Sequence, residues 1–290
     1  MAYQPIGSRE YKVMLNMNNF GSHTQLENDA GTFWAAFCAQ APKILDSDQD
    51  LRWKKEDPRK VEFLDSDDGD ASLYHHDFVL RRRRDAKGTK ITLKKRSADR
   101  VLASNNRVDL DDANERAPED SFVRRWFEEE FRVTDDGRPR SLFSHSLDLR
   151  GQDVSIKNLD SVKKVDSYFP GFKRGVDLDA DTSLAKVGSI DVTEYVVELD
   201  GVPKFLKDEK GAGAAVVAWY PDDKPAPCVV EFSFKYEGTE QAFGRKLTET
   251  SADVMRILGK MNDWRPGPKD RLTKTRWVYT KAGLIPKKES

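Results

Sequence analysis

The sequence predicts an α+β protein in which about eight antiparallel strands form one curled sheet or barrel, with helices packed outside it. Three observations support this prediction. Segments that alternate apolar and polar side chains recur along most of the chain, helical periodicity is confined to one segment near each end, and there is no repeat of fixed period. Many strands with few helices are typical of a closed or strongly curved sheet.

The N-terminal part predicts a strand followed by a helix. Residues 9 to 17 alternate, with Tyr11 and Val13 on the apolar side. Residues 27 to 45 carry aromatic and aliphatic side chains at helical spacing and end near Pro42. We expect this helix to pack on the sheet.

The next part predicts three short strands and a hairpin. The strands cover residues 60 to 64, 73 to 84 and 89 to 96. Gly88 can adopt a positive φ in the turn at residues 85 to 88, so the last two strands are expected to be antiparallel neighbours. Residues 97 to 120 are polar, lack periodicity and predict an exposed loop.

The second half predicts further strands and one long helix. Residues 134 to 190 are rich in Asp, Gly and Ser and predict at most a short strand near 162 to 169. Residues 240 to 264 have a helical pattern with one apolar side. The strands expected here cover residues 126 to 133, 191 to 201, 213 to 220, 227 to 238 and 273 to 281.

Charge and cysteine content exclude several classes of protein. Lys and Arg number 49 against 50 Asp and Glu, so the whole molecule has no basic field for unspecific binding of nucleic acid or membranes. Cys38 and Cys228 have no second ligand at metal-binding spacing and are expected to be reduced core thiols. No signal segment is evident, and no apolar stretch approaches the roughly 18 to 20 residues of a membrane helix. We expect a cytoplasmic protein.

The polar positions of the predicted strands are charged with unusual uniformity, while the opposite positions are apolar. In an ordinary half-buried sheet such charges face water. In a barrel whose apolar side faces outward they would line a tunnel, where basic residues clamp phosphate and carboxylates hold a divalent metal. Periodicity alone does not distinguish the two arrangements. The charged positions include Glu10 and Lys12, Arg81 and Arg83, Lys94 and Arg96, Glu128 to Arg132, Glu194 and Glu198, Glu231 and Lys235, and Lys274 and Arg276.

Six of these segments resemble motifs of the CYTH superfamily, also called triphosphate tunnel metalloenzymes, and they occur in the family's order. Each motif alone is weak in so charged a chain, but their common order and parity are moderately specific. The matching segments are residues 9 to 12 (E-x-E-x-K, second half), 63 to 66 (Y-Y-D-T), 80 to 83 (L-R-x-R), 91 to 94 (T-L-K), 127 to 130 (acidic segment) and 230 to 233 (late E-x-E).

The resemblance implies one tunnel domain over residues 1 to 290, with insertions near 97 to 120 and 134 to 190. It also implies hydrolysis of a triphosphate-containing substrate, either inorganic triphosphate or a nucleoside or thiamine triphosphate, with Mg²⁺ or Mn²⁺. The implied catalytic residues are Glu10, Lys12 and Glu231. The implied phosphate-binding residues are Lys12, Arg81, Arg83, Lys94, Arg132, Lys235 and Arg276. The implied metal ligands are Glu10, Glu128, Glu130 and Glu231.

Two positions depart from the family pattern. Ser8 stands at the first glutamate of E-x-E-x-K, and Ser233 stands at the second glutamate of the late E-x-E. Because the family's carboxylates at these positions hold the catalytic metal, an alternative is a non-catalytic module of the same fold that binds polyphosphate or a nucleotide. The candidate replacements are Glu128, Glu130, Glu194 and Glu198.

Other interpretations remain open at this point. The basic residues 81 to 84 and 94 to 96 also fit a nucleic-acid patch, although nearby acidic segments and the near-zero net charge disfavour it. Trp126 shares its parity with Glu128, so it either stacks on a nucleoside or closes one end of the barrel. Cyclase chemistry on ATP would use the same phosphate clamps, and the sequence does not set the oligomeric state.

Overall fold

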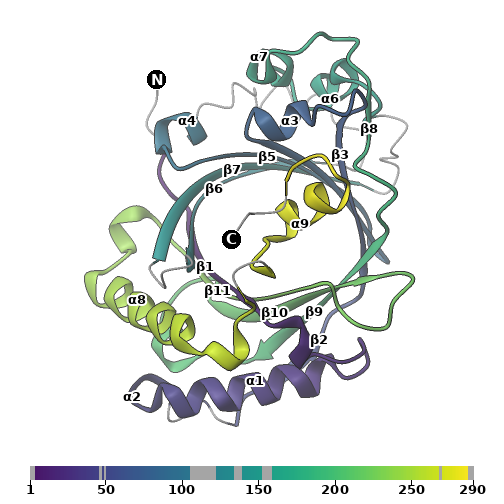
Figure 1. The fold of residues 1–290 in the computed structure, drawn as a ribbon. Coiled ribbons are helices and arrows are strands. Elements are labelled where there is room, and N and C mark those ends of the chain that lie inside the picture. Colours follow the sequence, from purple (N-terminus) through teal and green to yellow (C-terminus); the bar gives the residue numbers. More distant parts are fainter. Residues whose placement is uncertain are drawn as a thin grey trace.

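Nine strands close into a barrel in the computed structural model, which describes residues 4–45, 48, 50–104, 122–133, 139–151, 159–267 and 270–286 (Figure 1). Neighbouring strands follow the order β9-β10-β11-β1-β6-β7-β5-β4-β3, and the pairing of β3 with β9 closes the ring. The short strands β2 and β8 extend the sheet beside β9 and β3. The strands are β1 (Ser8–Leu15), β2 (Arg52–Lys55), β3 (Arg59–Ser66), β4 (Phe78–Asp85), β5 (Gly88–Ser97), β6 (Phe122–Val133), β7 (Pro139–Gly151), β8 (Leu184–Lys186), β9 (Val192–Asp200), β10 (Gly213–Pro221) and β11 (Val229–Glu237).

The barrel is mixed, which corrects the prediction of about eight antiparallel strands. β1 and β6 run parallel, whereas the other neighbouring pairs around the ring are antiparallel. Alternation along a strand fixes which residues share a face, but it carries no information about the direction of the neighbouring strand. The extra strand is β7, which lies in the segment where the sequence predicted no clear element.

Helices cover the outside of the barrel on two sides, and one helix lies within the ring of strands (Figure 1). α1 and α8 lie outside β1 and β9 to β11, and α6 and α7 lie beyond β4, β5 and β7. α9 lies inside the ring. No described helix is both long and apolar enough to span a bilayer. The helices are α1 (Leu26–Gln40), α2 (Pro42–Leu45), α3 (Ser72–His75), α4 (Arg100–Ser104), α6 (Val162–Tyr168), α7 (Phe172–Val176), α8 (Arg245–Lys260) and α9 (Lys274–Lys281), with 3₁₀ turns η1 (Met17–Asn19), η3 (Lys204–Leu206), η4 (Glu240–Ala242) and η5 (Asn262–Trp264).

The apolar positions of the strands face outward, as alternation requires if the charged positions face inward. Tyr11, Val13 and Leu15 of β1 join one outer core with α1 and α8. Ile91 and Leu93 of β5 join a second outer core with α6 and α7. The protein therefore places its two largest apolar clusters outside the barrel and leaves most of the interior to polar side chains.

The prediction of a strand at residues 273 to 281 was wrong, because this segment forms α9. The Thr273 hydroxyl caps the helix by accepting a hydrogen bond from the Arg276 backbone N–H at 3.3 Å. Val278 and Tyr279 pack on an apolar strip of the barrel interior that includes Phe63 of β3. The alternating pattern suggested a sheet, but the interior surface selects a helix here.

Three other predictions were also incomplete or wrong. Residues 162 to 169 form α6 rather than a strand, since Ser161 accepts a hydrogen bond from the Lys164 N–H as a helix cap. The strand predicted from residue 73 begins at Phe78, after α3. β2 and β8 were not predicted.

The remaining predicted elements are confirmed where the structure describes them. The strands beginning near residues 9, 60, 89, 126, 191, 213 and 227 are β1, β3, β5, the second half of β6, β9, β10 and β11. The predicted helices are α1 with α2, and α8 between the turns η4 and η5. Most of the predicted loop at 97 to 120 lies outside the described residues, and its described start contains α4.

Candidate functional site

A cavity of about 660 Å³ occupies the barrel interior and is lined by the inward positions of the strands. Among the described residues, ten lysines and arginines and seven aspartates and glutamates line it. The charged parity of the strands therefore faces a tunnel, and the solvated-face alternative is wrong for these positions. An excess of basic groups in a partly enclosed space attracts an anion.

The wall formed by β1 and β6 gathers carboxylates around one ammonium group. The parallel register places Ser8 beside Glu128, Glu10 beside Glu130 and Lys12 beside Arg132. The Lys12 ammonium lies 2.7 Å from Glu10 Oε2 and 2.7 Å from Glu130 Oε2. Because neighbours across parallel strands point to the same face, the alternation E-x-K in β1 and E-x-E-x-R in β6 produces this cluster directly.

The charges of this wall stabilise each other. Burial opposes the charge of Glu130, but Arg132 and Lys12 outweigh it and hold the pKa of that carboxyl well below its usual value. Burial likewise opposes the charge of Lys12, and Glu10 and Glu130 raise the pKa of Lys12 above its usual value. Glu130 is fully buried, yet these pKa shifts keep both groups ionised at neutral pH.

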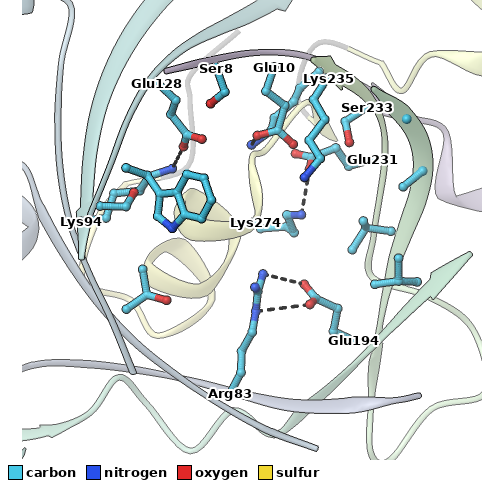
Figure 2. A pocket seen from close by; sticks show the side chains of 18 of the residues that line it. Ser8, Glu10, Arg83, Lys94, Glu128, Glu194, Glu231, Ser233, Lys235 and Lys274 are labelled. Atoms are coloured by element: carbon cyan, nitrogen blue, oxygen red, sulfur yellow. Dashed lines mark hydrogen bonds and ion pairs between the residues drawn. The ribbon is translucent and has the colours of Figure 1, made fainter. Parts of the chain in front are cut away.

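The opposite side of the tunnel is basic. β4 directs Arg81 and Arg83 inward, and Arg83 reaches Glu194 of β9 with Nε 3.3 Å from Oε1 (Figure 2). Trp219 also donates its indole N–H to Glu194 at 2.9 Å. Burial opposes the charge of Glu194, but Arg83 and Lys274 outweigh it and lower the pKa of this carboxyl. The ion pair with Glu194 thus fixes the position of the Arg83 side chain.

Arg81 is the basic group of this wall that lacks a counter-ion. No carboxylate of the described residues lies within ion-pair distance of its guanidinium, and its buried Nε has no hydrogen-bond partner among them. Burial, and then repulsion by Arg83, lower the pKa of Arg81 to about 9. The side chain is still cationic at neutral pH, so the tunnel presents an unmatched positive charge.

The other predicted phosphate-binding residues are distributed around the tunnel. Lys94 of β5 pairs with Glu128, and Arg132 pairs with Glu130 (Figure 2). Lys235 is exposed and has no ion pair among the described residues. Arg276 lines a second cavity at the far end of the barrel rather than this one.

Glu231, a predicted metal ligand, is not one of the three carboxylates that converge at β1 and β6. Its Oε1 is 2.7 Å from the ammonium of Lys274, the first residue of α9. Arg96 of β5 also reaches this end of α9 and donates to the Thr275 hydroxyl at 3.1 Å. The N-terminal turn of α9 therefore occupies the tunnel beside a predicted catalytic residue.

A buried carboxylate outside the tunnel wall anchors the other end of α9. Asp65 accepts hydrogen bonds from the Tyr279 hydroxyl at 2.6 Å and from the backbone N–H groups of Ser66, Leu73 and Tyr74. Because all of these donors converge on one buried side chain, α9 is held against β3 and α3. Lys274 is consequently a fixed part of the tunnel.

Several tunnel residues were missed by the sequence analysis. Lys90 of β5 pairs with Asp148 of β7 at 2.5 Å, and Asp148 also accepts from the Thr92 hydroxyl at 2.7 Å. Lys90 follows the same alternation as Lys94 and could have been found from it. Arg59, which lies 3.6 Å from Glu194, stands at the first position of β3 just before the predicted strand.

The two departures from the family pattern both face the tunnel. Ser8 and Ser233 line the cavity, in register with Glu128 and Lys12 respectively. Glu128 of the neighbouring strand β6 therefore offers a carboxylate beside Ser8, where the family pattern has one. Ser233 has no such neighbour in its register, since its partners are Lys12 and Ala215.

Three carboxylates can share one cation. One carboxylate oxygen each of Glu10, Glu128 and Glu130 lies within 4.8 Å of the other two. Among the described residues, no other three potential metal ligands lie this close together. Oxygen ligands of this kind suit Mg²⁺ and Mn²⁺. The residues present fit such an ion, although each carboxylate is already ion-paired, with Lys12, Lys94 or Arg132, and these basic groups would compete with it.

A closed barrel with its charged face inward is the tunnel that the sequence motifs predict. The closed barrel is the fold that the resemblance to the CYTH superfamily implies. In this tunnel, Glu10, Lys12, Arg81, Arg83 and Lys94 line one cavity.

Comparison with known proteins finds several similar solved structures, and three of them follow. No family model and no curated protein matches the chain. A candidate adenylyl cyclase from Hippeastrum, described as having a dominant triphosphatase activity, is 12% identical with a TM-score of 0.43, covering 98% of this chain and 100% of that one. A candidate adenylate cyclase from Bacillus halodurans is 10% identical with a TM-score of 0.35, covering 87% and 92%. A Pyrococcus horikoshii protein is 10% identical with a TM-score of 0.36, covering 93% and 99%.

Proposed function

We propose that this protein hydrolyses a triphosphate-containing compound inside the tunnel, with Mg²⁺ or Mn²⁺ as cofactor. The observation that carries the proposal is the combination of a three-carboxylate cluster, of which Glu10 and Glu128 line the cavity, with an unmatched arginine in the same cavity. A metal triphosphate supplies oxyanions to the arginine, which has no counter-ion among the described residues. It also supplies a divalent cation that can replace the ammonium and guanidinium groups now paired with the carboxylates.

The phosphate groups are bound by the basic wall in this proposal. Arg81 and Arg83 present guanidinium groups that match two phosphate oxygens at once, and Glu194 fixes the orientation of Arg83. Lys12, Lys94, Arg132 and Lys235 add positive charge around the same cavity. Such preorganised donors stabilise the charge that develops on phosphoryl oxygens during transfer.

The metal would be held by Glu10, Glu128 and Glu130, with Glu128 taking the place of the carboxylate that is absent at Ser8. A divalent ion supplies Lewis acidity to phosphoryl oxygens and lowers the pKa of bound water. Glu231 keeps the catalytic assignment that the resemblance gives it. Its pairing with Lys274 also places the α9 ammonium at the phosphate cavity.

The proposed reaction is an in-line hydrolysis. A water oxygen forms a bond to the terminal phosphorus, the phosphoanhydride P–O bond breaks, and the leaving oxygen departs with the remaining diphosphate. The water proton is released to solvent or to a carboxylate of the tunnel. The products carry more negative charge in total than the substrate, so their release requires the basic wall to exchange anions with solvent.

The test is phosphate release from tripolyphosphate, ATP and thiamine triphosphate, each with Mg²⁺, with Mn²⁺ and with chelator. We expect metal-dependent release from at least one of these compounds, and loss of release in Arg81→Ala. Formation of cyclic AMP and diphosphate from ATP would instead identify cyclase chemistry on the same clamps. No release from any of them would contradict hydrolysis.

A second candidate is a non-catalytic module that binds polyphosphate or a nucleotide. Ser233 favours it, because no carboxylate stands beside Ser233 in the strand register. Binding of tripolyphosphate that is equally tight with and without metal, together with no phosphate release, would support this candidate. We also propose a cytoplasmic location, since Cys38 and Cys228 are unpaired thiols.

A further inference from the structure

A second cavity of about 600 Å³ lies at the far end of the barrel. It is lined where β1 and β6 end and β7 begins, and by the segment that leads into α9. Lys12, Arg96, Arg132 and Glu231 line both cavities, together with Thr273 and Thr275 beside α9. The two cavities therefore adjoin at the tip of α9.

The second cavity is more basic than the first. Its described lining outside the shared residues contains Arg140, Arg265, Arg271 and Arg276 against one acidic residue, Asp77. All four of these basic groups are arginines, whose planar guanidinium favours bidentate contacts with oxyanions.

Two of these arginines shape the cavity. Arg265 donates to the Gly259 carbonyl at 2.6 Å, and Arg271 donates from Nε to the Pro266 carbonyl at 2.9 Å. These bonds fix the segment between α8 and α9 against the barrel. A rigid wall next to a cluster of positive charges is the arrangement that binding of an anion requires.

The other two arginines, Arg140 and Arg276, are positioned to bind an anion with their guanidinium groups. Arg140 is exposed and pairs across the β6–β7 register with Arg132, so two like charges stand opposite each other on the inner face. Arg132 is matched by Glu130, whereas Arg140 has no ion pair with the described residues. The buried Nε of Arg276 has no hydrogen-bond partner among them either. Like charges directly opposite each other destabilise a sheet unless an anion lies between them.

We infer that the far end of the tunnel is a second oxyanion site, in which Arg140 and Arg276 bind a phosphoryl group. This inference deepens the proposed function and rests on it for the identity of the oxyanion. Two sources of that chemistry are available at this position. One is the distal part of a linear polyphosphate that passes the tip of α9, and the other is orthophosphate released by hydrolysis in the first cavity.

The experiment is calorimetric titration of the full chain, without metal, with tripolyphosphate, with a longer linear polyphosphate and with orthophosphate. The variants are Arg140→Gln, Arg140→Gln with Arg276→Gln, Arg81→Ala, and Arg140→Gln with Arg81→Ala. Arg245→Gln, on the outer helix α8 and 90% exposed, is the matched control. Arg140 is exposed, so its single variant remains informative if the double variant does not fold.

We expect Arg140→Gln to weaken binding of the longer polyphosphate or of orthophosphate about tenfold, as loss of one charge-assisted contact predicts, and tripolyphosphate less than twofold. An effect limited to the longer chain identifies an extended substrate, and an effect on orthophosphate in the Arg81→Ala background identifies a product site. Unchanged binding of both ligands would overturn the inference. An equal loss for tripolyphosphate would also overturn it, because the arginines would then belong to the first cavity.

This outcome is separable from that of the proposed function. If the protein releases no phosphate from any triphosphate but Arg140→Gln still weakens oxyanion binding, hydrolysis fails and the second site stands. If release is normal and Arg140→Gln binds every ligand as the wild type does, the second site fails alone.

Discussion

The two faces of the same barrel wall carry the same residue types in opposite electrostatic states. In β4, Arg82 points outward and donates from Nε to Glu62 at 2.6 Å, although the side chain is nearly buried. Its neighbour Arg81 points inward and has no counter-ion among the described residues. The outward arginine is neutralised by the fold, whereas the inward one is left for a ligand.

The carboxylates of β6 extend the comparison of the two faces, although they are ion-paired on both. Glu129 faces outward, where Arg9 donates to it at 2.9 Å and the Ser141 hydroxyl donates at 2.8 Å. Glu128 and Glu130 face inward and cluster with Glu10. These glutamates of β6 are neighbours in sequence, so the side of the wall is what separates a structural role from the proposed functional role.

The comparison of Arg81 with Arg82 leads to the largest expected effect. Arg81→Ala should lower kcat/KM for the triphosphate by about 10³-fold, since a preorganised phosphate contact is lost. It should not lower the free energy of unfolding, because it removes an unpaired charge next to Arg83. Phosphate release and urea denaturation measure the two quantities.

Arg82→Ala is the matched control, and we expect the reverse pattern. It leaves Glu62 with Arg84 at 3.3 Å as its remaining partner and should cost about 2 kcal/mol of stability. Activity at a temperature below the melting transition should stay within about twofold of wild type, as for a change on the outer face. If Arg82→Ala abolishes activity in the folded protein, the assignment of the two faces is wrong.

The comparison of Glu10 with Glu129 tests the cofactor. Glu10→Gln should raise the Mg²⁺ or Mn²⁺ concentration needed for half-maximal activity by about 30-fold, because one of three candidate ligands loses its charge. Glu129→Gln should leave that concentration unchanged and cost about 1 kcal/mol of stability through its weakened contact with Arg9. A metal titration of initial rates decides between them, and equal shifts in both variants would exclude the β1–β6 cluster as the metal site.

Trp126 is an aromatic side chain on the charged, inward face of β6, so it tests what that face binds besides phosphate. Trp126 is 37% exposed. Its side chain lines the first cavity, as do Glu128 and Lys94. If the substrate carries an aromatic base, Trp126→Ala should lower kcat/KM for it about tenfold through lost stacking, and leave tripolyphosphate unaffected. If Trp126→Ala leaves kcat/KM unchanged for both substrates, Trp126 only closes the barrel end.

The last prediction concerns the pH dependence of stability, rather than activity, and an outward-facing histidine. Burial lowers the pKa of His145 to about 4, and its ring lies against Phe127 on the outer side of the wall. Between pH 6.5 and 4 the unfolded chain binds the proton and the folded chain does not, so stability falls by up to about 3 kcal/mol as pH decreases through this range. His145→Leu should flatten this slope in denaturation curves at pH 7, 6 and 5. If the substitution leaves the slope unchanged, the pH dependence of stability arises from other titratable groups.

The sequence predicted the charged face of the tunnel well because alternation is a local property. Lys12, Arg81 and Lys94 each lie on the predicted parity and share the cavity. Alternation could not say whether that parity faced inward, since this depends on which face the helices cover. The motif resemblance, and not periodicity, favoured the tunnel.

The sequence failed where the environment decides the structure. The alternation around Trp277 and Tyr279 predicts a strand, but the segment lies inside the barrel, where Asp65 binds Tyr279 and Glu231 binds Lys274. β7 was missed because its inner face is small and polar, with Ser144 and Ser146, so its alternation is weak. The pairing of Ser8 with Glu128 likewise depends on a parallel register that no local pattern encodes.

The most direct test of the central claim is calorimetric titration of tripolyphosphate into wild type, Arg81→Ala and Arg82→Ala. The account predicts binding by wild type and Arg82→Ala, and a loss of at least about a hundredfold in affinity for Arg81→Ala. Absence of binding to the wild type, or equal affinities of Arg81→Ala and wild type, would contradict the claim that the inward face of this barrel is a phosphate site.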